Sequence, residues 1–242
     1  MQSILRPVGI SGFWSLVGFL FLSFSLPADA AIPSIFGTRE FRADSFAALP
    51  QWQRVLDRIA SERAAYRACG TDARTCPNRG TLAWRALISS LRNAPRKEQV
   101  REVNRFVNQW NYKSDDDNYG RSDYWASPLE FFGRSGDCED YAIAKYVSLR
   151  ELGIPADDVR MVVLKDTLRD LAHAVLAVVV DGQVLILDNL TNAALPDTKL
   201  AHYSPYYSVN EQTRWAHVAR DPALVASLSP QVLQGKGPSR SR

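Results

Sequence analysis

Cys138 stands in an acidic stretch of the chain, "SGDCEDYAIAKYVSLRELGIP" at 135–155. Asp137 precedes the cysteine, and Glu139 and Asp140 follow it. A cysteine reacts as the thiolate, and neighbouring negative charge opposes that ionisation. A reactive cysteine at this position therefore needs something to compensate for the three carboxylates beside it.

Cysteine usage in the whole chain singles out the same residue. Cys69 and Cys76 bracket the polar loop "GTDART", at a spacing that can close as a disulfide in an oxidising compartment. The chain holds three cysteines, so this pairing leaves Cys138 as the odd thiol. An unpaired cysteine in an exported protein is either a buried apolar side chain or a reactive one.

A long helix is predicted to begin at Cys138. A break at Ser135-Gly136 precedes this helix, and Gly153 and Pro155 end it. The thiol then lies in the first turn, on the face that points to the core together with Ala142, Tyr146 and Leu149. Because the first N–H groups of a helix have no intrahelical acceptor, the backbone N–H of Cys138 is a candidate oxyanion donor.

A predicted β-hairpin supplies a base and its partner. In "AHAVLAVVVDGQVLILDNL", Asp181-Gly182 suits a two-residue type I′ turn between two apolar strands. Counting back from this turn, Val175 faces Asp188, and His173 lies on the same side of its strand as Val175. His173 and Asp188 are then diagonal neighbours, within reach of an imidazole–carboxylate hydrogen bond.

Three side chains thus fit the roles of nucleophile, base and orienting acid. Cys138 would attack, His173 would take the thiol proton, and Asp188 would hold the ring and stabilise the imidazolium. Taken alone, a histidine in a strand is more often a half-buried polar residue, and "LDN" is more often a turn. The shared face, with a lone cysteine at a helix start, favours a catalytic site. His202 and His217 lie in sequence interpreted as irregular and are expected at the surface.

The segments "YWASPLEFFGRSGDCEDYAIAKYVSLRELGIP", "AHAVLAV" and "LDNL" resemble the bacterial transglutaminase-like cysteine proteinases, and within them the LapG-type periplasmic adhesin proteases. The likeness runs from "FGTREFR" to "YSPYYSVNE". The resemblance implies a papain/transglutaminase-like fold and a catalytic triad at the matching positions Cys138, His173 and Asp188. One departure is Ala174, where several relatives have methionine; this should affect packing more than chemistry.

The resemblance also implies a substrate and a partner. It implies a calcium-dependent periplasmic cysteine endopeptidase that cleaves a large cell-surface adhesin near its N-terminus, which releases the adhesin and promotes biofilm dispersal. The periplasmic domain of a transmembrane cyclic-diguanylate receptor would sequester the protease. Two alternatives stay open: transglutaminase or amidase acyl transfer by the same triad, and a non-catalytic binding module that has kept the fold.

Bound calcium would explain the acidic residues beside the thiol. Calcium takes roughly six to eight oxygen ligands, largely carboxylates and backbone carbonyls, and "SDDDNYG" at 114–120 is expected to be a second oxygen-rich loop. We hypothesise that Asp115, Asp137 and Asp140 bind Ca²⁺, with Glu139 as a further ligand or a neighbour. The family resemblance also implies a calcium site beside the cysteine. The alternative is that Asp137 and Asp140 only cap the helix.

The remaining elements are helices followed by strands. Ser127 is a predicted N-cap, and Glu130 closes its capping box. A strand is expected at 159–165 and an irregular arm at 31–45. Further helices are expected at 46–68, 81–93, 97–112 and 127–134. This order predicts an α+β fold, with N-terminal helices and the cysteine-bearing helix packed on an antiparallel sheet.

Residues 1–30 are predicted to be a signal peptide. Arg6 provides a positive start, "SGFWSLVGFLFLSFSL" is an apolar run, and Ala28-Asp29-Ala30 has the small-x-small form of a cleavage site. The alternative is an uncleaved anchor, for which the apolar run is near the lower length limit. No second long apolar run follows, so we expect export to the periplasm without stable membrane insertion after cleavage.

Residues 31–228 are expected to form the protease domain, and 229–242 a disordered basic tail. The chain has 242 residues and a net charge of +3. The tail ends in "GKGPSRSR" without interleaved aromatic residues, so it is not expected to bind nucleic acid.

Overall fold

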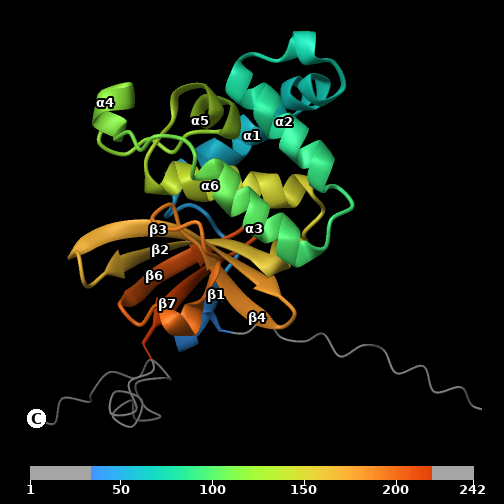
Figure 1. The fold of residues 1–242 in the computed structure, drawn as a ribbon. Helices are drawn as coiled ribbons and strands as arrows, with labels where there is room; N and C mark the ends of the chain where they lie inside the picture. The colour runs from blue at the N-terminus through green and yellow to red at the C-terminus, as the bar shows by residue number, and fades with distance from the viewer. Residues whose placement is uncertain (1–33, 220–242) are drawn as a thin grey trace, which may run out of the picture. The chain divides into compact units, whose positions relative to one another are not determined.

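A seven-stranded antiparallel sheet carries a layer of helices on one face (Figure 1). The computed structural model describes residues 34–219, so the predicted signal peptide at 1–30 and the predicted tail at 229–242 lie outside the described residues. Between 34 and 219, none of the helices combines the length and apolar character that a membrane crossing requires. The predicted α+β fold is confirmed.

The strands lie in the sheet in the order β1-β7-β6-β2-β3-β4-β5. Their bounds are β1 (Arg39–Ala43), β2 (Val159–Asp166), β3 (Leu171–Val180), β4 (Gln183–Leu187), β5 (Leu195–Pro196), β6 (Tyr203–Val209) and β7 (Arg214–Val218).

The five longer helices follow the predicted segments, whereas the loop expected at 114–120 is wrong over Asp115–Tyr119, which forms the short helix α4. Their bounds are α1 (Pro50–Thr71), α2 (Arg79–Leu91), α3 (Arg96–Val107), α4 (Asp115–Tyr119), α5 (Pro128–Arg134) and α6 (Cys138–Glu151). Ser127 caps α5, with the predicted capping box closed by Glu130. Past the end of α6, Gly153 has a φ of +92°, a left-handed conformation that favours glycine.

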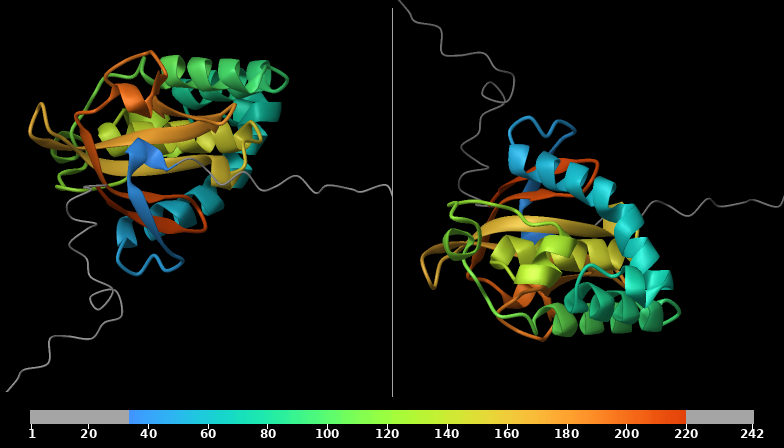
Figure 2. Two further views of the ribbon diagram at one scale, coloured as in Figure 1. Left: turned by 90° about the horizontal axis from the view of Figure 1, so that it is seen from below. Right: turned by 90° about the horizontal axis from the view of Figure 1, so that it is seen from above.

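The central helix of the fold is α6. It packs on β2 and β3 with one side and against α3 and α5 with the other (Figures 1 and 2). Every side chain from Tyr141 to Leu149 is buried as a result. The sequence predicts a single core-facing stripe, whereas the helix is enclosed all round from its second turn onwards.

The predicted hairpin is confirmed in its turn and its register. Val180 pairs with Gln183, and the pairing continues to Leu176 with Leu187. Asp181 and Gly182 have φ of 51° and 75°, as a type I′ turn requires.

The expected irregular arm at 31–45 is wrong over Arg39–Ala43, which forms β1 and pairs with β7 at the edge of the sheet. This strand has mostly exposed side chains, including Phe41. Its sequence therefore lacks the apolar alternation that identifies a half-buried strand.

The expectation for His217 is also wrong. This residue lies in β7 and is buried. Its ring nitrogens lie 2.7 Å from Thr38 Oγ1 and 2.8 Å from Ser208 Oγ. Burial lowers the pKa of His217 to about 4, so the ring is neutral at pH 7. The two hydroxyl groups supply hydrogen-bond partners for both of its nitrogens. His202, in the turn before β6, is half-buried.

Cys69 and Cys76 are joined by the predicted disulfide, which links the end of α1 to the loop that follows it. All three cysteines of the chain lie in the described residues, and Cys138 is the free thiol.

Lys145 is an unusual member of the core. It lies in α6, is fully buried, and its Nζ has no hydrogen-bond partner among residues 34–219. The ammonium lies 5.8 Å from the ring centroid of Tyr141. Burial lowers the pKa of Lys145 to about 7, although the charge of Asp188 acts in the opposite direction. The lysine therefore destabilises the folded state wherever the unfolded chain binds its proton.

We predict that Lys145→Met raises the free energy of unfolding by a few kcal/mol at pH 6–7, because an apolar side chain replaces a charge without a hydrogen bond. Since the folded-state pKa is depressed, the wild type gains stability as pH rises from about 7 towards the unfolded value near 10.5. The gain from the substitution should shrink over that range. Urea denaturation at several pH values measures it, with the exposed Lys97→Met as control. A gain independent of pH would contradict the prediction.

Candidate active site

The Cys138 thiol lies at the first residue of α6, between carboxylates and strand β3. It donates a hydrogen bond to Glu139 Oε2 at 3.1 Å, and the backbone N–H of Ala174 is directed at the sulfur. Burial raises the pKa of the thiol, the charge of Glu139 and its hydrogen bond raise it further, and Asp137 adds to the effect. The Ala174 N–H opposes these effects.

His173 and Asp188 are in contact, both buried. His173 Nε2 lies 2.9 Å from Asp188 Oδ1. The other oxygen, Oδ2, accepts a hydrogen bond of 2.5 Å from the hydroxyl of Tyr203. Burial raises the pKa of Asp188, but the hydrogen bond and charge of His173 and the Tyr203 hydroxyl outweigh it, so the pKa lies below its usual value. The carboxylate is thus held ionised and fixed in orientation.

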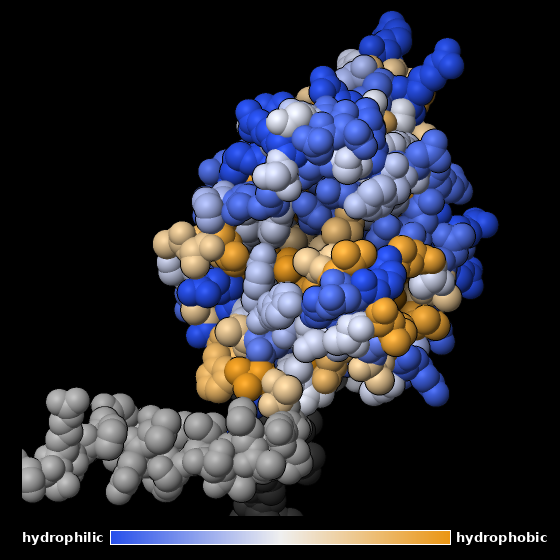
Figure 3. Space-filling view, turned by 90° about the vertical axis from the view of Figure 1, so that its left-hand side faces the viewer, coloured by the Kyte–Doolittle hydropathy of each residue, from blue (hydrophilic) through white to orange (hydrophobic). Residues whose placement is uncertain are grey.

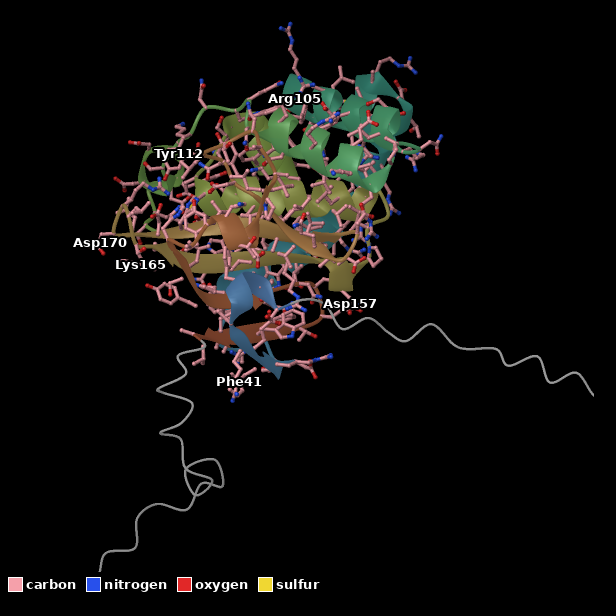
Figure 4. The ribbon with its side chains drawn as sticks, turned by 60° about the horizontal axis from the view of Figure 1, so that its bottom comes forward. Phe41, Arg105, Tyr112, Asp157, Lys165 and Asp170 are labelled. Atoms are coloured by element: carbon pink, nitrogen blue, oxygen red, sulfur yellow. A yellow bond between two sulfur atoms is a disulfide. The ribbon has the colours of Figure 1, made fainter. Side chains whose placement is uncertain are left out.

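Cys138 and His173 line the same groove, of about 540 Å³. Figure 3 shows the side of the molecule with α4 and the β2–β3 turn, where the helical half is mostly hydrophilic and apolar side chains gather in the sheet half. Figure 4 shows Tyr112 on the same side as Lys165, near the end of β2, and Asp170 in that turn. The other residues that line the groove are Tyr112, Arg169, Leu171, Ala172, Asn189 and Leu190.

The fold therefore brings Cys138, His173 and Asp188 to one place from a helix start, a strand and the end of the next strand. Because Asp188 holds Nε2 of His173, Nδ1 is the ring nitrogen left to accept a proton. A thiol, an imidazole and an orienting carboxylate can together perform acyl transfer through a thioester. Cys138, at the start of α6, also has a backbone N–H without an intrahelical acceptor.

The acidic side chains form a cluster beside this groove. Asp115, Asp137 and Asp140 each present an oxygen within 4.8 Å of the others. Glu139 belongs to an overlapping group with Asp115 and Asp123. The four residues predicted as calcium ligands are thus brought together by the start of α4 and the start of α6.

Close packing fixes the Asp140 carboxylate within this cluster. Its Oδ1 accepts from Ala126 N–H at 2.6 Å and its Oδ2 from Asp137 N–H at 3.3 Å. The second bond is the capping interaction expected as the alternative to metal binding. At Gly136, a Cβ would lie 2.0 Å from Asp140 Oδ2, so only glycine fits there.

Two oxygens of the cluster lack the partners that buried oxygens normally have. Asp115 Oδ1 and Asp137 Oδ1 are buried with no hydrogen-bond donor among the described residues. Burial and neighbouring carboxylates raise the pKa of Asp115 to about 6 and that of Asp137 to about 8. Oxygens without donors in a crowded carboxylate set fit a hard divalent cation such as Ca²⁺.

Sequence reasoning missed several residues of the site. Tyr203 reaches Asp188 from β6, and Asp123 joins the acidic cluster from the loop before α5. Asn108 Nδ2 donates to the backbone oxygen of Asp188 at 2.8 Å. The acidic character of Asp123 next to the predicted ligands is a usable signal, whereas nothing local in "HYSPYY" marks Tyr203.

Comparison with known proteins identifies the chain's relatives. The family model of the bacterial transglutaminase-like cysteine proteinases (BTLCP) matches residues 59–222. Among solved structures, LapG from Legionella pneumophila is 33% identical with a TM-score of 0.57, covering 66% of this chain and 92% of that chain. No curated protein shows a significant match.

Two further LapG structures from Legionella pneumophila bear on calcium. An EGTA-treated LapG is 34% identical with a TM-score of 0.57, covering 65% of this chain and 88% of that one. A calcium-bound LapG is 38% identical with a TM-score of 0.52, covering 57% and 77%. LapG of that organism thus binds calcium.

We predict that Asp188→Asn slows alkylation of Cys138 by iodoacetamide at pH 7 about tenfold or more, because an amide cannot stabilise the imidazolium that pairs with the thiolate. The other two cysteines form a disulfide, so the rate reports Cys138 alone. Asp181→Asn, at the opposite end of the same hairpin, is the control, since Asn-Gly also suits the turn. Equal rates in the two variants would contradict the role of Asp188.

Proposed function

Since the chain belongs to the bacterial transglutaminase-like cysteine proteinases and is a cysteine protease of the LapG type, we propose that it is a calcium-dependent periplasmic endopeptidase with the triad Cys138, His173 and Asp188. The observation that carries the proposal is the His173–Asp188 pair at 2.9 Å on the groove that also holds the thiol.

In the proposed mechanism, His173 accepts the thiol proton and the Cys138 sulfur attacks a peptide carbonyl. Asp188 stabilises the imidazolium, held in place by the Tyr203 hydroxyl. The backbone N–H of Cys138 donates to the developing oxyanion. His173 then protonates the leaving amine, and water, deprotonated by the same ring, hydrolyses the thioester.

We assign Asp115, Asp137 and Asp140 as calcium ligands, with Glu139 as the fourth candidate. Bound Ca²⁺ would supply positive charge that offsets the carboxylates opposing the thiolate. Asp140 fixes the start of α6, because its carboxylate accepts hydrogen bonds from the backbone N–H groups of Ala126 and Asp137. Gly136 leaves room for this carboxylate, since a Cβ there would overlap it. The calcium-bound LapG of Legionella pneumophila supports the assignment.

The proposed substrate is a large surface adhesin, cleaved near its N-terminus so that the adhesin is released and biofilm disperses. The proposed regulatory partner is the periplasmic domain of a transmembrane cyclic-diguanylate receptor. Both proposals rest on the similarity to the LapG-type proteases, and export rests on the predicted signal peptide at 1–30.

We predict that the purified protein cuts N-terminal adhesin fragments from the same cell at one site, and that Cys138→Ala abolishes the cut. A labelled primary amine included in the reaction tests acyl transfer at the same time. Mass spectrometry should find two fragments carrying no amine label. A labelled or crosslinked product would identify a transglutaminase instead. If the protein binds the adhesin fragment but leaves it uncut and unlabelled, it is a non-catalytic binding module.

We predict that Asp115→Asn weakens Ca²⁺ binding about tenfold or more, because it removes an anionic ligand whose Oδ1 has no hydrogen-bond partner among the described residues. Isothermal titration measures the affinity, and the rise in melting temperature from EGTA to Ca²⁺ should shrink with it. Asp116→Asn is the matched control, since this neighbouring carboxylate is exposed and lies outside the cluster. Equal affinities in the two variants would remove Asp115 from the site.

A further inference from the structure

A buried lysine without a part in the proposed mechanism lies in the helix that carries the thiol. Lys145 comes seven residues after Cys138, so it lies on the same face of α6, roughly 10.5 Å further along the helix axis. Its side chain is fully buried, and its Nζ has no hydrogen-bond partner among residues 34–219. An ammonium in this place lowers the stability of the fold, which an apolar side chain of similar length would not do.

The charge that acts on Lys145 is the carboxylate of the triad. The helices α3 and α5 and the strands β2 and β3 pack against α6. Of the titratable groups in the described part of the chain, Asp188 is the one whose charge bears on this lysine. The ring of Tyr141, with its centroid 5.8 Å from Nζ, adds a neutral neighbour. Lys145 and Asp188 thus interact through space, without a hydrogen bond between them.

Helix α3 fixes the separation between this lysine and the carboxylate. Asn108 Nδ2 donates to the backbone oxygens of Asp188 and Thr191, at 2.8 and 2.9 Å. Asn104 Nδ2 donates to the same oxygen of Thr191 at 3.0 Å. Because α3 also packs on α6, the segment that bears Asp188 is joined to the helix that bears Lys145. The ammonium therefore acts on the triad from a constant distance.

Arg169 is a second cation whose charge reaches Asp188. Its side chain lines the groove, is 40% exposed, and pairs with Asp166 Oδ2 at 2.6 Å. Solvent and this partner weaken its effect on the triad. The Tyr203 hydroxyl at the same carboxylate is uncharged, because burial and its bond to Asp188 raise the pKa of Tyr203. Of these two cations, Lys145 is the one that water does not screen.

A buried positive charge next to an imidazole–carboxylate pair disfavours a second positive charge on the imidazole. His173 has to be neutral to accept the thiol proton, whereas the charge of Asp188 alone favours the imidazolium. Cys138 and Tyr112 share the groove with His173 and are uncharged below pH 7, because burial raises the pKa of the thiol and of the phenol.

We propose that Lys145 is a positioning residue of the active site, whose buried ammonium keeps His173 neutral in mildly acidic solution so that the ring can accept the thiol proton. The inference rests on the proposed function and extends its working range to acidic pH. Burial lowers the pKa of Lys145 to about 7. The lysine is therefore charged below that pH, in the range where an imidazole normally takes up its proton.

Titration of the three histidine rings by NMR tests this charge effect directly. Two unit charges roughly 10 Å apart, at an effective dielectric constant of about 20, change each other's protonation equilibrium about tenfold. In Lys145→Met the midpoint of the His173 ring signal should therefore move up by about one pH unit. The signals of His202 and His217 should titrate as in the wild type. An unchanged midpoint for His173 overturns the proposal.

The pH profile of adhesin-fragment cleavage tests the consequence for activity, with Ca²⁺ saturating throughout. In Lys145→Met the acidic half-maximum of kcat/KM should move up by about one pH unit. At pH 8 the wild-type lysine is largely uncharged, so the two enzymes should agree within about twofold. A loss of equal size at pH 6 and pH 8 indicates a purely structural role and counts against the proposal.

Lys145→Gln separates the loss of charge from a change in packing. Glutamine is neutral like methionine but leaves a polar group in the core, so this variant should be the less stable of the two. Both variants should nevertheless move the His173 midpoint in the same direction and by a similar amount. Movement in one variant alone would assign the effect to packing and overturn the proposal.

Failure of the proposed function gives a different result. The NMR titration needs no substrate, so it decides the role of Lys145 even if no adhesin fragment is cut at any pH. An upward movement of the His173 midpoint in a protein that cuts nothing keeps the charge effect and rejects proteolysis. Cleavage with an unchanged midpoint keeps the protease and rejects the role of Lys145.

Discussion

The packing of α6 on β3 is the contact on which the rest of the site depends. The helix is enclosed from its second turn onwards, so its first residue has a fixed position relative to the strand. That residue is the thiol, and the strand directs the Ala174 N–H at its sulfur. His173 is the next residue back along the strand. One helix–sheet contact therefore sets the positions of the thiol and the imidazole together.

Electrostatic repulsion opposes ionisation of the thiol in this arrangement, and the charges responsible lie at the N-terminal end of α6. The carboxylates at the start of α6 are favourable to the helix dipole but repel one another and the thiolate. Asp137 Oδ1 there and Asp115 Oδ1 at the start of α4 are buried without a hydrogen-bond donor among residues 34–219. Deeper in the same helix, the buried ammonium of Lys145 has no hydrogen-bond partner in the part of the chain that the structure describes. Such groups reduce stability, which is typical of sites where function has set the choice of residue.

The sequence was sufficient to bring His173 and Asp188 together, because a two-residue turn fixes both pairing and side-chain parity along a hairpin. His173 and Asp188 could thus be placed on one face without knowledge of the remaining fold. Tyr203 could not, because it reaches them only through the pairing of β6 with β2. β1 and His217 were missed for a related reason: an exposed edge strand shows no apolar alternation, and its pairing with β7 joins residues far apart in the chain.

The disulfide between Cys69 and Cys76 has a consequence for oxidative damage. It occupies the other two cysteines of the chain, so no second thiol within the molecule is available to Cys138. A sulfenic acid formed there cannot be resolved internally as a disulfide. Its recovery depends on a thiol from outside, and in the absence of one further oxidant converts it to sulfinic and sulfonic acids.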